Sequence, residues 1–251
     1  MSAAAHERDV IILGIDTAGP ADSVALVEAG EVLASLYVRR PSAFSRSLLR
    51  SIDRLFDWTG CTLADLGGLA VNVGPGAFTG IRVGLAMAQG LAMASDKPLV
   101  GCSAFEALVA MAPGWEGAMC PVLNAYKGEV YAALYHRLGR QVRQVMSGLV
   151  VAPEMLCTLV MERTLFLGSG VKAYGATLTA ALGEHAVCVD TGLEEVGLAV
   201  SIARVGQARL QEAEIAPLPV PRPLYIRSAD ARIPRGAIQT QSATQEVPPG
   251  V

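Results

Sequence analysis

The glycine-rich segment from Gly74 to Gly84 has the residue types best suited to binding a charged ligand. It reads Gly-Pro-Gly-Ala-Phe-Thr-Gly-Ile-Arg-Val-Gly, follows the apolar run 69–73 and opens a predicted helix of small residues at 80–94. A strand, a glycine-rich turn and a helix start form an anion cradle in many α/β proteins. The segment lacks the ending of a Walker loop and the spacing of a dinucleotide fingerprint. Two interpretations stay open: an unusual phosphate loop, or a tight turn before a close-packed helix.

Histidine and serine positions argue against two other kinds of catalytic site. The three histidines, His6, His136 and His185, form no pair with the spacing that puts two zinc ligands on one helix face. The chain also has no Gly-x-Ser-x-Gly stretch, the nucleophile turn of α/β-hydrolases. We therefore expect neither a catalytic metal nor a serine nucleophile.

Apolar runs and helical spacing occur in an order that repeats. The first set consists of strands at 10–15, 23–28 and 31–38, helix 45–58, strand 69–73, helix 80–94, strand 98–102 and helix 103–111. The second set consists of strands at 119–124, 130–135 and 142–150, helix 153–161, strand 165–167, helix 171–182, strand 187–189 and helix 196–210. This duplication resembles the actin, Hsp70 and sugar-kinase superfamily. It implies an α/β fold of two ribonuclease-H-like halves, each a mixed five-stranded sheet with flanking helices.

The expected halves are residues 1–105 and 106–227, and the last helix could pack back on the first half. Residues 228–251 contain few large apolar side chains and are predicted to form a mobile tail.

The composition is 52% hydrophobic with a net charge of -3, which argues against autonomous nucleic-acid binding. No apolar run reaches the ~20 residues of a membrane span. Five scattered cysteines and the absence of an apolar leader favour reduced thiols in the cytoplasm.

The superfamily resemblance implies a nucleotide between the halves. It places Asp16 and Thr17 at the phosphates, Asn124 at the matching position of the second half, and Gly168 and Gly170 beside the adenosine. Mg²⁺ prefers charged oxygen ligands, so one carboxylate and one amide make a weak substitute for two carboxylates. We interpret these residues as a vestigial nucleotide site. The alternatives are a strand-end carboxylate bonded to turn amides at Asp16 and an ordinary helix start at 168–170.

Four motifs together resemble the TsaB family, formerly called YeaZ, over about residues 10–227. They are Ile12-Leu13-Gly14-Ile15-Asp16-Thr17, the 74–84 segment, Gly128-Glu129-Val130-Tyr131 and Pro223-Leu224-Tyr225-Ile226-Arg227. The chain departs from the family pattern at Phe44-Ser45, Asn124 and Tyr126, where the family has His-Ser, Asp and Arg. These losses fit a scaffold better than an enzyme.

This resemblance implies a non-catalytic subunit for threonylcarbamoylation of adenosine in tRNA (t6A). The expected partners are a TsaD-like catalytic subunit and a TsaE-like P-loop ATPase, with a homodimer when the chain is alone. Contact with tRNA would be indirect, through the complex, and no membrane contact is expected. The chain itself would require no cofactor, which leaves a partner interface as the place where ATP or ADP could bind.

The family uses the first two helices as its partner surface. Small side chains on a helix let another helix approach closely, and apolar neighbours add contact area. The predicted surface therefore consists of Gly80, Val83, Gly84, Met87, Ala88 and Leu91 with Leu48 and Ile52. The alternative is that this face packs on the chain's own sheet.

Two other functions are weighed against the scaffold. The first is a stand-alone ATP-dependent phosphotransferase, which the fold pattern and Asp16 favour and Asn124 opposes. The second is a glycoprotease, a label once given to the family through its relation to TsaD. The missing histidine pair opposes that label.

Overall fold

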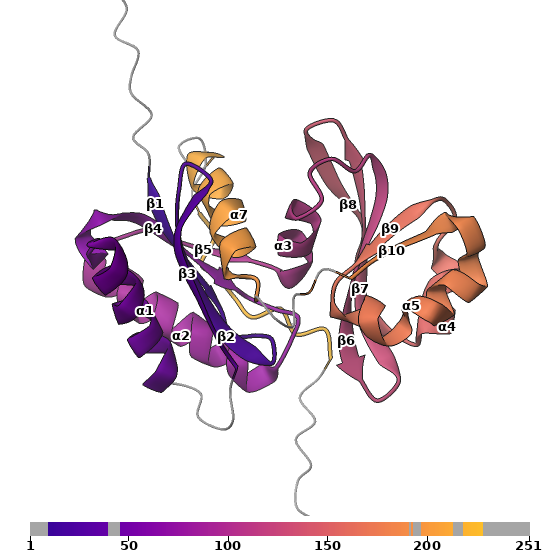
Figure 1. Ribbon diagram of the computed structural model, residues 1–251, viewed down its shortest axis with the longest axis horizontal. Coiled ribbons are helices and arrows are strands. Elements are labelled where there is room, and N and C mark those ends of the chain that lie inside the picture. Colours follow the sequence, from indigo (N-terminus) through magenta and orange to yellow (C-terminus); the bar gives the residue numbers. More distant parts are fainter. Residues whose placement is uncertain (1–9, 40–45, 191, 193–196, 213–217, 228–251) are drawn as a thin grey trace, which may run out of the picture.

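Two five-stranded mixed sheets form the framework of the molecule (Figure 1). The computed structural model describes residues 10–39, 46–190, 192, 197–212 and 218–227. The predicted tail after residue 227 and the Phe44-Ser45 pair lie outside these residues. The strand orders are β3-β2-β1-β4-β5 and β10-β9-β6-β7-β8. In each sheet the first three strands pair antiparallel and the other two add in parallel, so the predicted duplicated, ribonuclease-H-like fold is confirmed.

The first sheet and its neighbouring helices are built from residues 11–110. Its elements are β1 (Ile11–Asp16), β2 (Ala21–Glu28), β3 (Glu31–Arg39), α1 (Arg46–Thr59), the 3-10 turn η1 (Leu63–Asp65), β4 (Leu66–Asn72), α2 (Phe78–Ser95), β5 (Leu99–Cys102) and α3 (Ala104–Ala110). Helix α2 begins two residues before the predicted start.

The second sheet repeats the plan. Its elements are β6 (Gly117–Tyr126), β7 (Glu129–Leu138), β8 (Gln141–Val151), α4 (Pro153–Leu159), β9 (Thr164–Leu167), α5 (Ser169–Leu182), the 3-10 turn η2 (Gly183–His185) and β10 (Ala186–Val189). A last helix, α7 (Ala199–Glu212), follows.

Particular residues mark where several helices begin and end. The Ser103 hydroxyl accepts a hydrogen bond from the Glu106 amide at 3.2 Å, while the Glu106 carboxylate accepts one from the Ser103 amide at 2.8 Å. This reciprocal pair is a capping box, which satisfies two amides at the start of α3. Gly60 stops α1 with a φ of +72°, a conformation that glycine adopts readily.

Helices α7 and α3 lie between the two sheets (Figure 1). They belong to one continuous apolar core that includes Ile12 and Ala70 of the first sheet and Met119 and Leu165 of the second. The outer faces of the sheets are covered separately, by α1 and α2 on one side and by α4 and α5 on the other (Figure 1). The shared core joins the halves along their inner faces, and the remaining opening between them lies at one end.

The cysteines and the helix lengths can be compared with what the sequence predicts. All five cysteines are free thiols. Within the described residues, no helix has both the length and the apolar character required to cross a bilayer.

Candidate functional site

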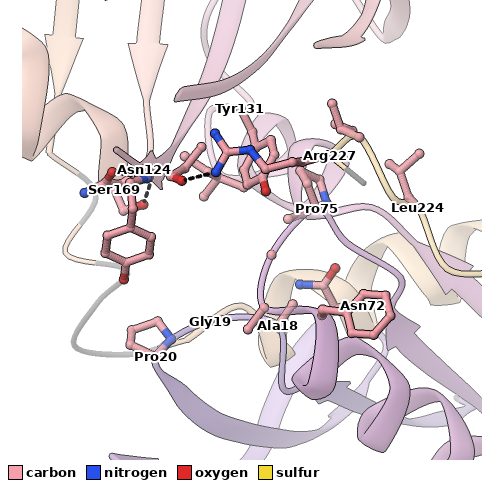
Figure 2. Close-up of a pocket in the computed structure, with 18 of the residues that line it drawn as sticks. Ala18, Gly19, Pro20, Asn72, Pro75, Asn124, Tyr131, Ser169, Leu224 and Arg227 are labelled. Carbon is pink, nitrogen blue, oxygen red and sulfur yellow. Dashed lines mark hydrogen bonds between the residues drawn. The ribbon is translucent and has the colours of Figure 1, made fainter. Parts of the chain in front are cut away.

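A cavity of about 450 Å³ opens between the ends of the two sheets (Figure 2). The first half contributes the β1–β2 turn and the segment after β4, and the second half contributes the β6–β7 hairpin and the start of α5. Figure 2 shows Pro20 facing Asn124 and Ser169 across the opening, with Arg227 and Leu224 along one side. The cavity brings Asp16 and Asn124 to one place but does not include Thr17, Gly168 or Gly170 in its lining.

Asp16 is at the base of the cavity, where the residue is only 3% exposed. Oδ1 accepts hydrogen bonds from the Ala18 amide at 3.0 Å and from Asn72 Nδ2 at 2.8 Å. Oδ2 accepts one from the Leu198 amide at 3.1 Å, just before α7 begins. A carboxylate is favoured there because the N-terminus of a helix carries partial positive charge. Asp16 therefore ties three separate segments together.

The β1–β2 turn is held against the start of α2. The Thr17 hydroxyl donates to the Gly80 carbonyl at 2.6 Å, and the Ala77 amide donates to the Ala18 carbonyl at 2.7 Å. A Cβ on Gly80 would lie 1.9 Å from the Thr17 carbonyl oxygen, and one on Gly84 would lie 2.3 Å from Thr17 Oγ1. Glycine is needed at both positions so that the turn can approach the helix. The geometry therefore favours the close-packed turn over the phosphate loop.

The second half also uses its polar groups internally. Asn124 Oδ1 accepts a hydrogen bond from the Tyr126 amide at 2.8 Å, and the Asn124 amide donates to Ser169 Oγ at 3.2 Å. Gly168 and Gly170 pack on β6, since a Cβ on either would lie 2.5–2.6 Å from atoms of Val122. In the segment 168–170, only Ser169 lines the cavity.

These residues do not fit a magnesium-bound nucleotide. Such a site needs carboxylate oxygens free to coordinate Mg²⁺, whereas the Asp16 carboxylate accepts three internal hydrogen bonds and the facing residue, Asn124, is an amide. Within the described part of the chain, no cluster of three or more His, Cys, Asp or Glu side chains could hold a metal ion. The cavity is lined chiefly by apolar and aromatic groups, such as Phe78 and Tyr131, and its polar lining comes from Asp16, Asn72, Asn124, Lys127, Ser169 and Arg227.

The predicted partner surface needs correction at several positions. Gly80, Gly84 and Ala88 are buried against the chain itself, as are Leu48 and Ile52 of α1. Val83, Met87 and Leu91 are half-buried and pack on the core between α1, α2 and the first sheet. The small-residue face identified from the sequence therefore packs inward.

The outward face of α2 carries a second set of small residues. Ala86, Gly90 and Ala94 are exposed at a spacing of four, next to Met93, whose side chain is 85% exposed. A Cβ on Gly90 would meet no atom within 4 Å. Residues offset by two positions lie on roughly opposite sides of a helix, so Ala86 and Gly90 face outward once Gly84 and Ala88 pack inward.

A groove of about 500 Å³ runs between α1, η1 and α2 beside this face. Its apolar lining includes Leu49, Phe56 and Leu91, and Asp53 and Asp57 contribute carboxylates. Leu49 is exposed, although it belongs to the apolar stripe of α1. The groove makes this side of the molecule both apolar and concave.

The sequence model of the tRNA N6-adenosine threonylcarbamoyltransferase family, TsaD, matches residues 41–235, which is more than half of the chain. The chain belongs to the TsaD family. Its predicted resemblance to TsaB within that family is confirmed by the individual relatives.

Two of these relatives carry the name tRNA threonylcarbamoyladenosine biosynthesis protein TsaB. The Escherichia coli protein is 40% identical over 131 residues, which are 50% of this chain and 55% of that protein. That match therefore spans only about half of the relative's length. The Bacillus subtilis protein is 26% identical over 223 residues, covering 88% of this chain and 95% of that protein. A solved structure of YeaZ from Pseudomonas aeruginosa superimposes with a TM-score of 0.66 at 26% identity, covering 81% of this chain and 95% of that one.

Proposed function

We propose that the chain is an accessory subunit in t6A synthesis, which binds and activates a TsaD-like threonylcarbamoyl transferase and has no turnover of its own. The observation that carries this proposal is the state of Asp16. Its carboxylate accepts three hydrogen bonds from the chain itself, and Asn124 stands opposite. A subunit that retains the fold but uses this carboxylate for structure is suited to a supporting role.

The relatives favour the same pathway. Both TsaB proteins described above are named for threonylcarbamoyladenosine biosynthesis, and the matching family is that of the transferase. The chain belongs to the transferase family, and its Asp16 carboxylate is occupied by internal hydrogen bonds. Together these two observations support a paralogue that pairs with the catalytic member.

The proposed docking surface is the outward face of α2 with the groove beside α1. Ala86, Gly90 and Ala94 present little side-chain bulk, so a partner helix could approach closely, because the distance between packed helices depends on the side chains at the contact. Leu49 and Met93 supply exposed apolar area at the margins. A stable interface of this kind would bury about 2,000 Å² or more in total.

The same surface is proposed to pair two copies of the chain when no TsaD-like protein is present. A TsaE-like ATPase would bind the assembled pair, and tRNA would be held by the complex. The chain itself would need no cofactor, and ATP or ADP would bind only where a partner completes a site.

The test is to mix the full chain with the TsaD-like protein of its own genome and to measure mass by light scattering and threonylcarbamoyl transfer to tRNA. We expect a heteromeric complex and a transfer rate that depends on the chain. Gly90→Arg should abolish both effects by placing a long side chain on the docking face. Gly114→Arg is the matched control, because Gly114 is exposed elsewhere and a Cβ there meets no atom within 4 Å. A TsaD-like protein that reaches full activity without the chain would refute the proposal.

A further inference from the structure

The segment 218–227, here called the strap, crosses from the first half to the second beside the cavity (Figure 1). Its contacts with the first half centre on the start of α2. The Leu224 amide donates to the Val73 carbonyl at 2.7 Å, which adds the strap to the end of β4. The Tyr225 ring lies 4.9 Å from the Phe78 ring, and the Tyr225 hydroxyl accepts a hydrogen bond from Arg82 Nε at 3.0 Å.

Arg82 completes this cluster. Its guanidinium carbon is 3.8 Å from the centre of the Phe78 ring and 5.9 Å from that of Tyr225. A guanidinium over an aromatic face is attracted by the ring quadrupole. The first turn of α2 is therefore held to the strap by one hydrogen bond, one cation–π contact and one ring contact, all of them to Tyr225, while the Arg82–Phe78 contact lies within α2.

The other end of the strap is held by the β6–β7 hairpin. Arg227 donates from Nη1 to the Ala125 carbonyl at 2.9 Å and pairs through Nη2 with the Glu129 carboxylate. Its guanidinium carbon is also 5.7 Å from the centre of the Tyr131 ring. Arginine suits this position because its planar fork can reach a carbonyl and a carboxylate at once.

We propose that the strap is a positioning device, in which Tyr225 and Arg227 keep the first turn of α2 in a fixed relation to the β6–β7 hairpin. This inference rests on the proposed function, because α2 carries the proposed docking face. A preorganised face binds more tightly, since less conformational freedom is lost on association. The strap would thus set the affinity for the TsaD-like partner from a site that the partner does not touch.

The halves do not depend on the strap for their attachment. Helices α3 and α7 join them through the shared core, and Arg209 of α7 bonds both the Gly101 carbonyl and the Glu106 carboxylate. Loss of strap contacts should therefore leave the fold intact and loosen only the open end. This separation makes the strap testable with folded variants.

The experiment uses two conservative variants, each altering contacts with one half only. Tyr225→Phe removes the hydroxyl that Arg82 reaches in the first half, and Arg227→Lys removes the fork that reaches Ala125 and Glu129 in the second. Arg222→Ala, at an exposed arginine of the same strap, is the matched control. Hydrogen exchange is measured on the full chain for peptides covering 78–85 and 125–131, and for α7 as an internal reference.

We expect each variant to accelerate exchange at both ends by about 10-fold, including the end that it does not contact, with α7 unchanged. Calorimetric titration with the TsaD-like protein should give a Kd weakened about 5- to 20-fold, within the usual range of coupling between sites. The control should change neither quantity. Acceleration confined to the altered end, or an unchanged Kd despite faster exchange at both ends, would overturn the proposal. A wild-type chain that fails to bind the partner would refute the proposed function instead, and the exchange at the distant end would still decide whether the strap couples the halves.

Discussion

The carboxylate of Asp16 accepts a hydrogen bond from the backbone amide of Leu198, 182 residues later in the chain, at 3.1 Å. This contact joins the end of the first strand to the start of the last helix. Both residues line the cavity between the ends of the two sheets. The Asp16 carboxylate at the base of this cavity therefore serves to hold the fold together.

Asp16→Asn should lower the free energy of unfolding by about 2 kcal/mol or more, because a charged acceptor is replaced by a group whose amide would face hydrogen-bond donors. Urea unfolding provides the measurement. Asp57→Asn is the control, since Asp57 is exposed and its pair with Arg54 lies on the surface, where such changes usually alter stability by less than about 0.5 kcal/mol. The folded Asp16→Asn chain should still stimulate a TsaD-like partner. Unchanged stability with lost stimulation would instead indicate a direct chemical role for Asp16.

Two glycines of α2 should respond to alanine in opposite directions. Gly80→Ala places a Cβ 1.9 Å from the Thr17 carbonyl oxygen, and we expect a loss of about 1–3 kcal/mol from overpacking. Gly90→Ala meets open space and should gain about 0.5–1 kcal/mol, because alanine restricts the unfolded chain and favours the helix. Thermal and urea unfolding of the two variants make the comparison. Equal effects at the two positions would contradict the inward and outward assignment of the two faces.

Much of the fold was predictable, because hydrophobic periodicity and turn residues specify it locally. Asp16 was correctly placed at the end of a strand, and the helix predicted from residue 103 is α3, with Ser103 as its N-cap. The faces of α2 were not distinguished, since its small apolar residues occur all around the helix and periodicity alone does not select which set packs inward. Two contacts of the site were not predictable because they join residues far apart in the sequence, where no periodic signal exists. They are the hydrogen bond from the Leu198 amide to Asp16 and that from Arg227 to the Ala125 carbonyl.

Cys61 should report directly on the docking surface. It is half-buried in the groove between α1 and α2, so iodoacetamide should label it in the free chain and fail to label it in the complex with a TsaD-like protein. Mass spectrometry of tryptic peptides measures each site. Cys188 of the second half is also half-buried and should react equally in both states. Labelling of Cys61 at the same rate within a proven complex would place the partner on another face.

The remaining buried thiols should be nearly inert in the same experiment. Burial raises the pKa of the Cys102 thiol to about 12 and raises the pKa of Cys120 as well. The thiolate is the reactive species, so both residues should label only after unfolding. Rapid labelling of Cys102 in the folded chain would show that the joint between α7 and β5 opens far more easily than its packing indicates.

We expect the free energy of unfolding to fall at alkaline pH because of Tyr135. Burial, followed by the nearby Glu106 carboxylate, raises the pKa of its phenol from 10.0 to about 12, and its side chain is only 6% exposed. Above pH 10 the unfolded chain releases this proton while the folded chain retains it, so the unfolded state gains. The contribution of the protonated phenol to the free energy of unfolding is therefore fully present below pH 10. It is lost as the pH rises through about 12, by on the order of 2 kcal/mol.

Urea unfolding of wild type and Tyr135→Phe from pH 8 to 11 measures this contribution. The wild type should lose stability faster than the variant above pH 10, while other titrating groups, including Cys102, are common to both. Parallel curves for the two proteins would show that the phenol stays accessible to solvent in the folded state.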